Sequence, residues 1–168
     1  SIEDCFQEFL KVELLDGDNK WRCPFCKSFQ KSTKFLKITM LPKILIVHFK
    51  RFKVNYDLSF ENFEKINKFI SYPLELDLTK YWPPIESESD NEKLKNFQQR
   101  GQVPPFKYKL YEFVNHSGNL RGGHYTNFVY RGKQKGWCFY DDTRVMKNQD
   151  PTSAFNSNAY VLFYSRVY

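Results

Sequence analysis

The spacing of apolar residues predicts one helix at the start of the chain and extended segments after it. Apolar residues between positions 2 and 10 recur every three or four residues, and Ser1 before them is a suitable helix cap followed by acids. Asp16–Asn19 is rich in turn residues, and Trp21–Cys26 is expected to be a strand that enters a tight turn. The continuous apolar run Ile44–Phe49 predicts a strand buried on both faces.

Strands dominate the prediction for the rest of the chain. Residues 53–67 are polar and compatible with a hairpin, and Phe69–Leu76 is expected to be extended. Pro, Ser and charged residues dominate residues 83–105, so we expect a surface insertion that is partly disordered. Four clearer strands follow at even spacing, which favours an antiparallel meander. They are Lys107–His116, Tyr125–Tyr130, Trp137–Tyr140 and Ala159–Ser165.

Composition favours one domain, or a large part of one, with much antiparallel sheet. A chain of 168 residues can bury a core, and 41% hydrophobic residues is ordinary for a folded soluble domain. The 17 Phe and 11 Tyr suit the half-buried surface of a pleated sheet. We therefore expect an α+β fold that is mostly antiparallel sheet.

The charge pattern argues against two classes of partner. The net charge is +7, but the basic residues are spread out, and the nearest approach to a cluster is Lys50, Arg51 and Lys53. We therefore expect no nucleic acid partner. No apolar run is long enough for a membrane span, and no signal peptide is visible at Ser1–Asp4. We expect a cytoplasmic or nuclear protein, and a start without Met suggests a fragment.

The strongest candidate chemistry lies at His124, which follows Gly122 and Gly123 at the mouth of a predicted strand. Glycines allow backbone angles closed to other residues and let a substrate chain approach closely. A catalytic histidine also needs a group that holds its tautomer, and Asp141 would reach it if the two predicted strands form a hairpin. The plainer alternatives stay open, because such a histidine is often structural and Asp141-Asp142 also suits an ordinary turn.

The four cysteines suggest a metal site but no nucleophile. Cys23 and Cys26, with a proline between them, have the spacing of a zinc knuckle that supplies two thiolates. Two thiolates are half of a tetrahedral site, so either a second pair lies outside this chain or the pair is a metal-free remnant. Cys5 and Cys138 lack knuckle spacing and any adjacent oxyanion-hole signature, and we expect both to be structural.

Five segments, in this order, resemble the C-terminal half of a ubiquitin-specific protease catalytic domain. Asp16–Cys26 resembles the second zinc knuckle of that family, and Leu41–Phe52 resembles its central palm strand. Asn115–Tyr125 resembles the histidine box, and Trp137–Asp142 resembles the acid box, with Tyr140 where the family usually has Phe. Tyr160–Tyr164 resembles the closing strand.

This resemblance implies a papain-like cysteine protease hand fold, of which the chain would supply the palm and part of the fingers. Residues 1–168 would be the C-terminal part of one catalytic domain. Within it, about 15–40 would be half of a zinc-ribbon fingers region, and 107–168 would be the palm with the His and Asp boxes. The family's cysteine box belongs upstream and is absent from these residues.

The resemblance also implies roles for matching positions. His124 would be the general base, Asp141 would orient it, and Asp142 would be an auxiliary acid. A loop from Asn115 to Arg121 would move over the bound tail of ubiquitin. The channel for that tail would be lined by Arg51, Phe52, Gly122, Gly123 and Tyr125.

The implied reaction is thiol-dependent hydrolysis of the isopeptide bond after the C-terminal Gly-Gly of ubiquitin, by way of a thioester. The implied partners are ubiquitin, ubiquitinated proteins and the N-terminal half of the domain, which would bring the nucleophilic cysteine and two more zinc ligands. The chain alone would be inactive. A non-catalytic ubiquitin-binding or scaffolding module and a nucleic-acid-binding zinc ribbon are the alternatives. A His124–Asp141 pair favours the enzyme, because a pure binding module needs no such pair.

Overall fold

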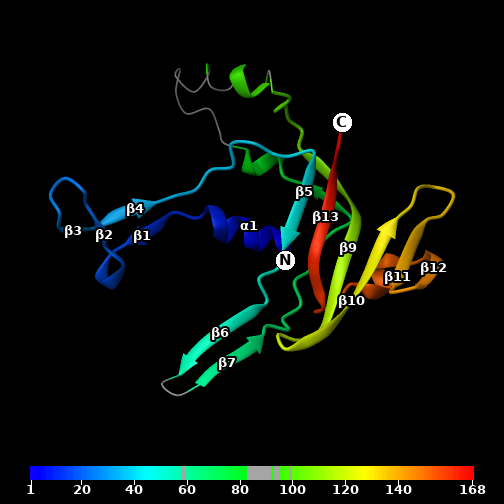
Figure 1. Ribbon diagram of the computed structural model, residues 1–168. Coiled ribbons are helices and arrows are strands. Elements are labelled where there is room, and N and C mark those ends of the chain that lie inside the picture. The colour runs from blue at the N-terminus through cyan, green and yellow to red at the C-terminus, as the bar shows by residue number, and fades with distance from the viewer. Residues whose placement is uncertain (58–59, 83–91, 93–94, 99) are drawn as a thin grey trace.

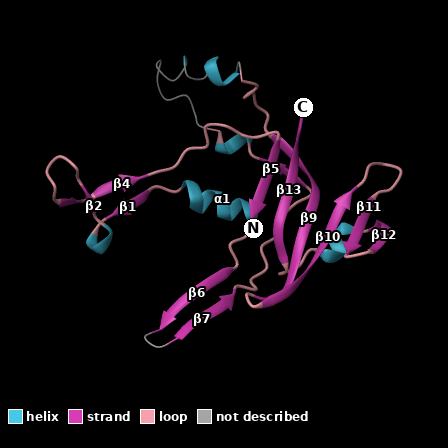
Figure 2. Ribbon diagram, viewed as in Figure 1, coloured by secondary structure: helices cyan, strands magenta, loops and turns pink. Residues whose placement is uncertain are grey.

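An antiparallel sheet forms the centre of the computed structural model, and smaller hairpins project from it (Figures 1 and 2). The structure describes residues 1–57, 60–82, 92, 95–98 and 100–168. Most of the predicted insertion at 83–105 lies outside the described residues. Within the described part of the chain, no helix has the length and apolar character needed to cross a membrane.

The central sheet has the strand order β12-β11-β10-β9-β13-β5, and β8 pairs with β9 beside this path. The four predicted strands are confirmed, and the meander holds from β9 to β12. The last strand breaks the meander because it returns to pair with the other side of β9. The strands of this sheet are β5 (Ile44–His48), β8 (Glu75–Asp77), β9 (Lys107–Asn119), β10 (Gly122–Tyr130), β11 (Trp137–Asp141), β12 (Arg144–Gln149) and β13 (Ala159–Val167).

Three two-stranded sheets lie outside this sheet among the described residues; two of them are hairpins, and the third pairs residues 13–15 with residues 32–34 around one of these hairpins. The one predicted between residues 53 and 67 is confirmed, and it extends away from the sheet in Figure 1. The other two form an arm beyond the first helix. The paired strands are β6 (Phe52–Asp57) with β7 (Phe60–Lys65), β1 (Glu13–Leu15) with β4 (Ser32–Lys34), and β2 (Trp21–Arg22) with β3 (Phe29–Gln30). Short 3-10 helices span Gly17–Asn19, Thr79–Tyr81 and Pro151–Ala154.

The predicted N-terminal helix is confirmed as α1 (Ile2–Leu10). Ser1 caps it, because its Oγ accepts from the backbone N–H of Asp4 at 3.2 Å while the Asp4 carboxylate accepts from the Ser1 amine at 2.7 Å. Only Ile2 is buried along its apolar stripe, and Phe9 is 59% exposed. The helix therefore has an apolar face that the described residues only partly cover.

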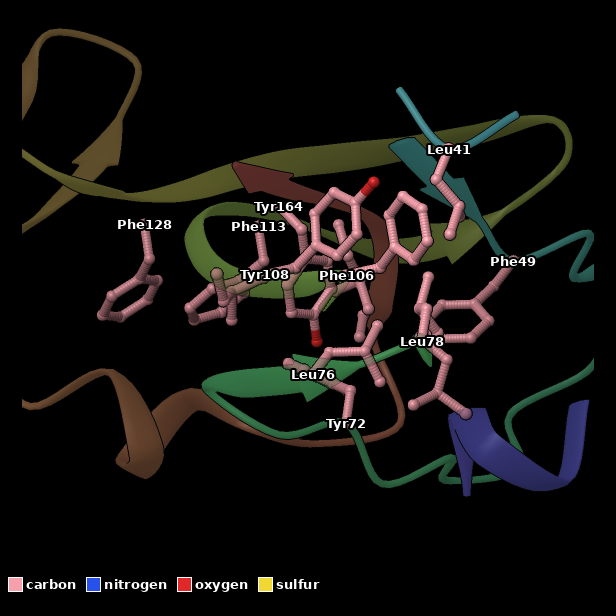
Figure 3. Packing of buried hydrophobic residues seen from close by; sticks show 14 residues of the cluster. Leu41, Phe49, Tyr72, Leu76, Leu78, Phe106, Tyr108, Phe113, Phe128 and Tyr164 are labelled. Atoms are coloured by element: carbon pink, nitrogen blue, oxygen red, sulfur yellow. The ribbon is translucent and has the colours of Figure 1, made fainter. Parts of the chain in front are cut away.

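The core consists mainly of large aromatic and aliphatic side chains that pack together against the central sheet (Figure 3). Phe113 of β9 stacks on Phe128 of β10, with ring centroids 4.9 Å apart and planes 4° apart. Tyr108 and Tyr164 are almost fully buried, and their hydroxyls donate to backbone carbonyls. This core makes β9, β10 and β13 the rigid platform on which the candidate site stands.

The strand predicted to be buried on both faces is instead an edge strand. β5 pairs with β13, and it is the last strand on that side of the described sheet. Its residues alternate between exposed and half-buried, and Ile46 is 58% exposed. The prediction was wrong because nothing among the described residues covers the outer face of β5.

Candidate active site

His124 and Asp141 lie in direct contact across two neighbouring strands. The distance from Nε2 of His124 to Oδ1 of Asp141 is 2.5 Å. The β10–β11 register pairs Asn127 with Tyr140, so one step further along the ladder Thr126 lies opposite Asp141. His124, two residues before Thr126, is then the diagonal neighbour of Asp141 on the same face of the sheet. The predicted hairpin and the predicted His–Asp hydrogen bond are both present.

The contact raises the basicity of a surface histidine. The side chain of His124 is 47% exposed, and that of Asp141 is 36% exposed. The hydrogen bond to Asp141 raises the pKa of His124, and the charges of Asp141 and Asp142 act in the same direction. Because Nε2 is engaged by the carboxylate, Nδ1 is the ring nitrogen left for a reacting group.

Asp142 forms part of a turn, and its carboxylate also lies close to His124 and Asp141. It occupies the left-handed region, with a φ of +49°, in the two-residue connection between β11 and β12. The ordinary-turn interpretation therefore holds for its backbone. Its carboxylate nevertheless belongs to a cluster with His124 and Asp141, in which the charged or ring atoms all lie within 4.8 Å of one another.

The two glycines before His124 serve different purposes. Neither Gly122 nor Gly123 has a positive φ, so the expectation of unusual backbone angles at these two residues is wrong. A positive φ occurs instead at Gly118, with a value of +108°. A Cβ on Gly123 would overlap the His116 ring and the Ser117 carbonyl, whereas one on Gly122 would meet nothing within 4 Å. Gly123 is therefore required by packing, and Gly122 leaves the surface beside His124 open.

The expected loop from Asn115 to Arg121 is mostly strand. β9 continues to Asn119, and β10 begins at Gly122, so only two residues connect them. The Asn119 side chain closes the turn, because its Oδ1 accepts from the N–H groups of Arg121 at 2.9 Å and Gly122 at 3.2 Å. The glycine-rich segment is thus the tip of a paired hairpin.

Aromatic rings gather on the other side of this hairpin tip. Tyr125 and His116 face each other across the strands, with ring centroids 4.7 Å apart. Phe52 and Tyr160 complete the group at 5.5 and 5.7 Å from the His116 ring. Tyr160 sits at a bulge in β13, where Ala159 and Val161 pair with consecutive residues of β9. We call Phe52, His116, Tyr125 and Tyr160 the aromatic group.

Sequence reasoning did not select His116 or Tyr160 as site residues. Both residues lay in segments that resemble the family, His116 in the histidine box and Tyr160 in the closing strand. Register offered a further signal, because a two-residue turn at Leu120-Arg121 places His116 opposite Tyr125. Tyr125 itself is 53% exposed, so the group has an open side.

Arg51 lies inside the protein, not on a channel wall. The residue is 2% exposed. Its Nε donates to the Ala159 carbonyl at 2.7 Å, and its Nη1 donates to the carbonyls of Ile66 and Lys68 at 2.9 and 2.8 Å. Burial lowers the pKa of the guanidinium. Arg51 therefore ties together the backbone segments that carry the aromatic group.

The Cys-x-x-Cys segment forms a tight hydrogen-bonded turn. The Cys23 N–H donates to the Ser28 carbonyl at 3.0 Å, and Lys27 donates back to the Cys23 carbonyl at 2.9 Å with a φ of +57°. Ser28 lies 3.0 Å from Cys26 Sγ, and its hydrogen bonds lower the pKa of that thiol to about 7. A thiol that ionises near neutral pH suits metal binding, so Cys26 fits a zinc ligand, and Cys23 precedes it at the spacing of a zinc knuckle.

The other two cysteines have structural surroundings. Cys5 is exposed on α1. Cys138 is 2% exposed on β11, and its thiol donates to the Lys135 carbonyl at 3.6 Å. No hydrogen bond joins either thiol to His124 within the described part of the chain. The described residues thus hold the His124–Asp141 pair without a cysteine hydrogen-bonded to it.

Comparison with known proteins finds a matching family and similar relatives. The model of the family described as ubiquitin carboxyl-terminal hydrolase matches residues 5–164. "Ubiquitin carboxyl-terminal hydrolase 4" of Saccharomyces cerevisiae is 48% identical over 176 aligned residues, which cover 100% of this chain and 18% of that protein. "Ubiquitin carboxyl-terminal hydrolase 5" of the same organism is 46% identical over 170 aligned residues and is covered to 20%. The chain therefore spans about a fifth of the length of these curated relatives.

Two solved structures have the same fold over the whole chain. The SAGA Ubp8/Sgf11/Sus1/Sgf73 DUB module bound to ubiquitin aldehyde aligns with a TM-score of 0.74 and 29% identity, and the alignment covers 100% of this chain and 34% of that one. The module bound to monoubiquitin aligns with a TM-score of 0.73 and 27% identity and covers 33% of that chain. The hand-like fold expected from the resemblance is confirmed for this part of the domain.

Proposed function

The chain belongs to the ubiquitin carboxyl-terminal hydrolase family, and from this we propose that it supplies the base and the orienting acid of a cysteine deubiquitinase. The observation that carries the proposal is the 2.5 Å contact between His124 and Asp141 beside the open backbone of Gly122. The nucleophilic cysteine would come from sequence outside these residues, in the N-terminal part of the same catalytic domain.

In this proposal His124 moves the proton at each step. Its Nδ1 takes the proton of the cysteine thiol, while its Nε2–H stays bonded to Asp141, which fixes the tautomer and stabilises the imidazolium. The thiolate attacks the carbonyl carbon of the last glycine of ubiquitin, and the imidazolium gives its proton to the departing lysine amine. A water molecule, deprotonated by His124, then hydrolyses the thioester. The charge of Asp142 adds to the stabilisation of the imidazolium.

The substrate proposed for this site ends in a chain segment without bulky side chains. Gly122 has open space where a side chain would stand, on the same face of β10 as His124, and Tyr125 presents an exposed ring on the opposite face. A glycine-ended chain can approach such a backbone more closely than a chain with side chains. Ubiquitin and ubiquitinated proteins are therefore the proposed partners, with Phe52 and Tyr125 as candidate contacts for the Gly-Gly tail and Arg51 acting through the backbone that it holds.

Zinc is proposed as a structural group of the same domain. Cys23 and Cys26 would supply two thiolates, and two further ligands would come from the upstream part of the domain. A bound ion would hold the arm formed by β1 to β4, whose own contacts are few and mostly exposed. It would take no part in the proton transfers at His124.

The test uses the complete protein and a ubiquitin amide substrate. His124→Ala should lower turnover by about two orders of magnitude or more, the usual scale for loss of a general base. The control is Lys133→Ala, because Lys133 is exposed in the turn that joins β10 to β11. Near-normal turnover by His124→Ala would remove His124 from the mechanism. The isolated chain should not react with a ubiquitin probe whose C-terminus is thiol-reactive, and labelling of it would contradict the proposed division of the active site.

A further inference from the structure

The backbone of His116 is hydrogen-bonded to two segments outside the hairpin that carries His124. Its N–H donates to the Asn158 carbonyl at 2.9 Å, just before β13 begins. Its carbonyl accepts from Lys65 Nζ at 2.5 Å, at the end of β7. The residue is 3% exposed. Its backbone therefore joins three segments that are far apart in the sequence.

The ring of His116 contacts the residues on both sides of His124. It lies against the Tyr125 ring, with centroids 4.7 Å apart and planes 48° apart. It also fills the space where Gly123 would otherwise carry a side chain, and Nε2 is its nearest atom there. Side chains alternate along a strand, so Gly123 and Tyr125 face His116 while His124 points to the opposite face, toward Asp141.

The surroundings of His116 favour an uncharged ring whose contribution is its packing against neighbouring residues. Burial lowers its pKa, and the ammonium group of Lys65 acts in the same direction. Its Nδ1 is buried and has no hydrogen-bond partner among the described residues. No carboxylate pairs with the ring there, and its other neighbours are the rings of Phe52 and Tyr160.

We propose that His116 is a positioning residue, whose ring supports β10 beneath Gly123 and Tyr125 and thereby holds His124 in line with Asp141 and the reacting thiol. The inference rests on the proposed function of His124. It assigns to His116 no contact with the reacting atoms. A displacement of about 1 Å in a catalytic group can cost a hundredfold in rate, so loss of this support should appear in kcat.

Two substitutions of His116 test whether the atom at the position of Nε2 is the one that supports β10. The amide of glutamine reaches about as far as Nε2 of histidine, whereas the amide of asparagine ends near Nδ1. His116→Gln therefore keeps an atom beneath Gly123, and His116→Asn leaves that space empty. Both variants bury an uncharged amide at the same position, so their general cost to stability is similar. The difference between them isolates the support of β10.

The experiment compares kcat and KM for a ubiquitin amide substrate in the complete protein, with Lys133→Asn, at an exposed position in the turn between β10 and β11, as the control. We expect kcat of His116→Asn to fall by about tenfold to a hundredfold and that of His116→Gln to fall by less than about fivefold, with KM changed by less than about twofold in both. Equal kcat values for the two variants, or losses confined to KM, would overturn the inference.

Thermal melts and a second catalytic variant complete the design. If His116→Asn alone fails to fold, a kcat of His116→Gln within fivefold of the wild-type value at unchanged KM supports the inference, and a larger loss of kcat overturns it. His124→Ala is measured in parallel. If His124→Ala retains its turnover, the proposed function itself is refuted. If His124→Ala loses its turnover while His116→Asn and His116→Gln have equal kcat values, only the role of His116 is refuted.

Discussion

Nε of Arg51 donates a hydrogen bond of 2.7 Å to the carbonyl of Ala159, across a separation of 108 residues. Ala159 is the first residue of β13 and pairs with Asn115 of β9. The bulge at Tyr160 follows at once. The buried guanidinium thus fixes the end of β13 where the aromatic group is built, although it is itself out of reach of a ligand.

Arg51→Lys tests this bracing role. Lysine keeps the charge but cannot donate to three separated carbonyls, so we expect the free energy of unfolding to fall by about 2–4 kcal/mol. Urea denaturation of the complete protein gives this value, and KM should change little in the folded fraction. The control is Lys50→Gln at the neighbouring exposed position, which should change stability by less than about 0.5 kcal/mol. Unchanged stability with a raised KM would instead make Arg51 a substrate contact.

Asp141→Asn should lower kcat by about two to four orders of magnitude, because an amide cannot stabilise the imidazolium and can favour the wrong tautomer. KM should stay close to its original value, since Asp141 is not expected to touch ubiquitin. Steady-state kinetics of the complete protein measures both. Asp142→Asn is the matched comparison and should cost less, because Asp142 acts on His124 through its charge without a hydrogen bond. Equal losses in the two variants would contradict the assignment of Asp141 as the orienting acid.

The pH profile should follow the ionisation of His124. Its pKa is raised above the ordinary 6.5, chiefly by the hydrogen bond to Asp141. A general base must be neutral, so kcat/KM should fall as the pH drops through this raised pKa, and the acid limb should lie above pH 6.5. In Asp141→Asn the limb should move to lower pH. A limb that is unchanged by this substitution would mean that another group controls the profile.

Removal of one thiolate tests the zinc site. Cys23→Ser in the complete protein should lower the zinc content and the melting temperature, because a structural zinc site loses most of its affinity when a ligand is lost. Cys5→Ser is the control, since Cys5 is an exposed cysteine on α1. Elemental analysis of both purified variants decides the matter. Unchanged zinc content after Cys23→Ser would show that the knuckle does not hold the metal.

The sequence predicted those elements whose own pattern determines them. The N-terminal helix carries a capping box at Ser1 and Asp4, and β9, β10, β11 and β13 are rich in aromatic and β-branched residues. β12 was missed because Arg144–Gln149 is polar and lacks alternation, so it becomes a strand only by pairing with β11. The exposure of β5 was missed because an apolar run does not show which of its faces will be covered.

The same distinction applies to the candidate site. The His124–Asp141 contact could be predicted, because it needs only a hairpin between two recognisable strands. The role of Gly123 could not, because it depends on the His116 ring folding back over the opposite strand. Arg51 was assigned to the channel on resemblance, and only the structure places its guanidinium among backbone carbonyls.

The open edge of β5 has a practical consequence for biochemistry on this part of the protein. An unpaired strand edge offers its N–H and C=O groups to any other strand, and Ile44 and Ile46 beside it are 45% and 58% exposed. The segment expressed alone is therefore expected to self-associate by adding strand to strand, and light scattering of dilute samples would reveal it. Inactivity of such a preparation could then come from aggregation or from lack of the proposed upstream cysteine, so reconstitution calls for co-expression with the residues proposed to carry that cysteine.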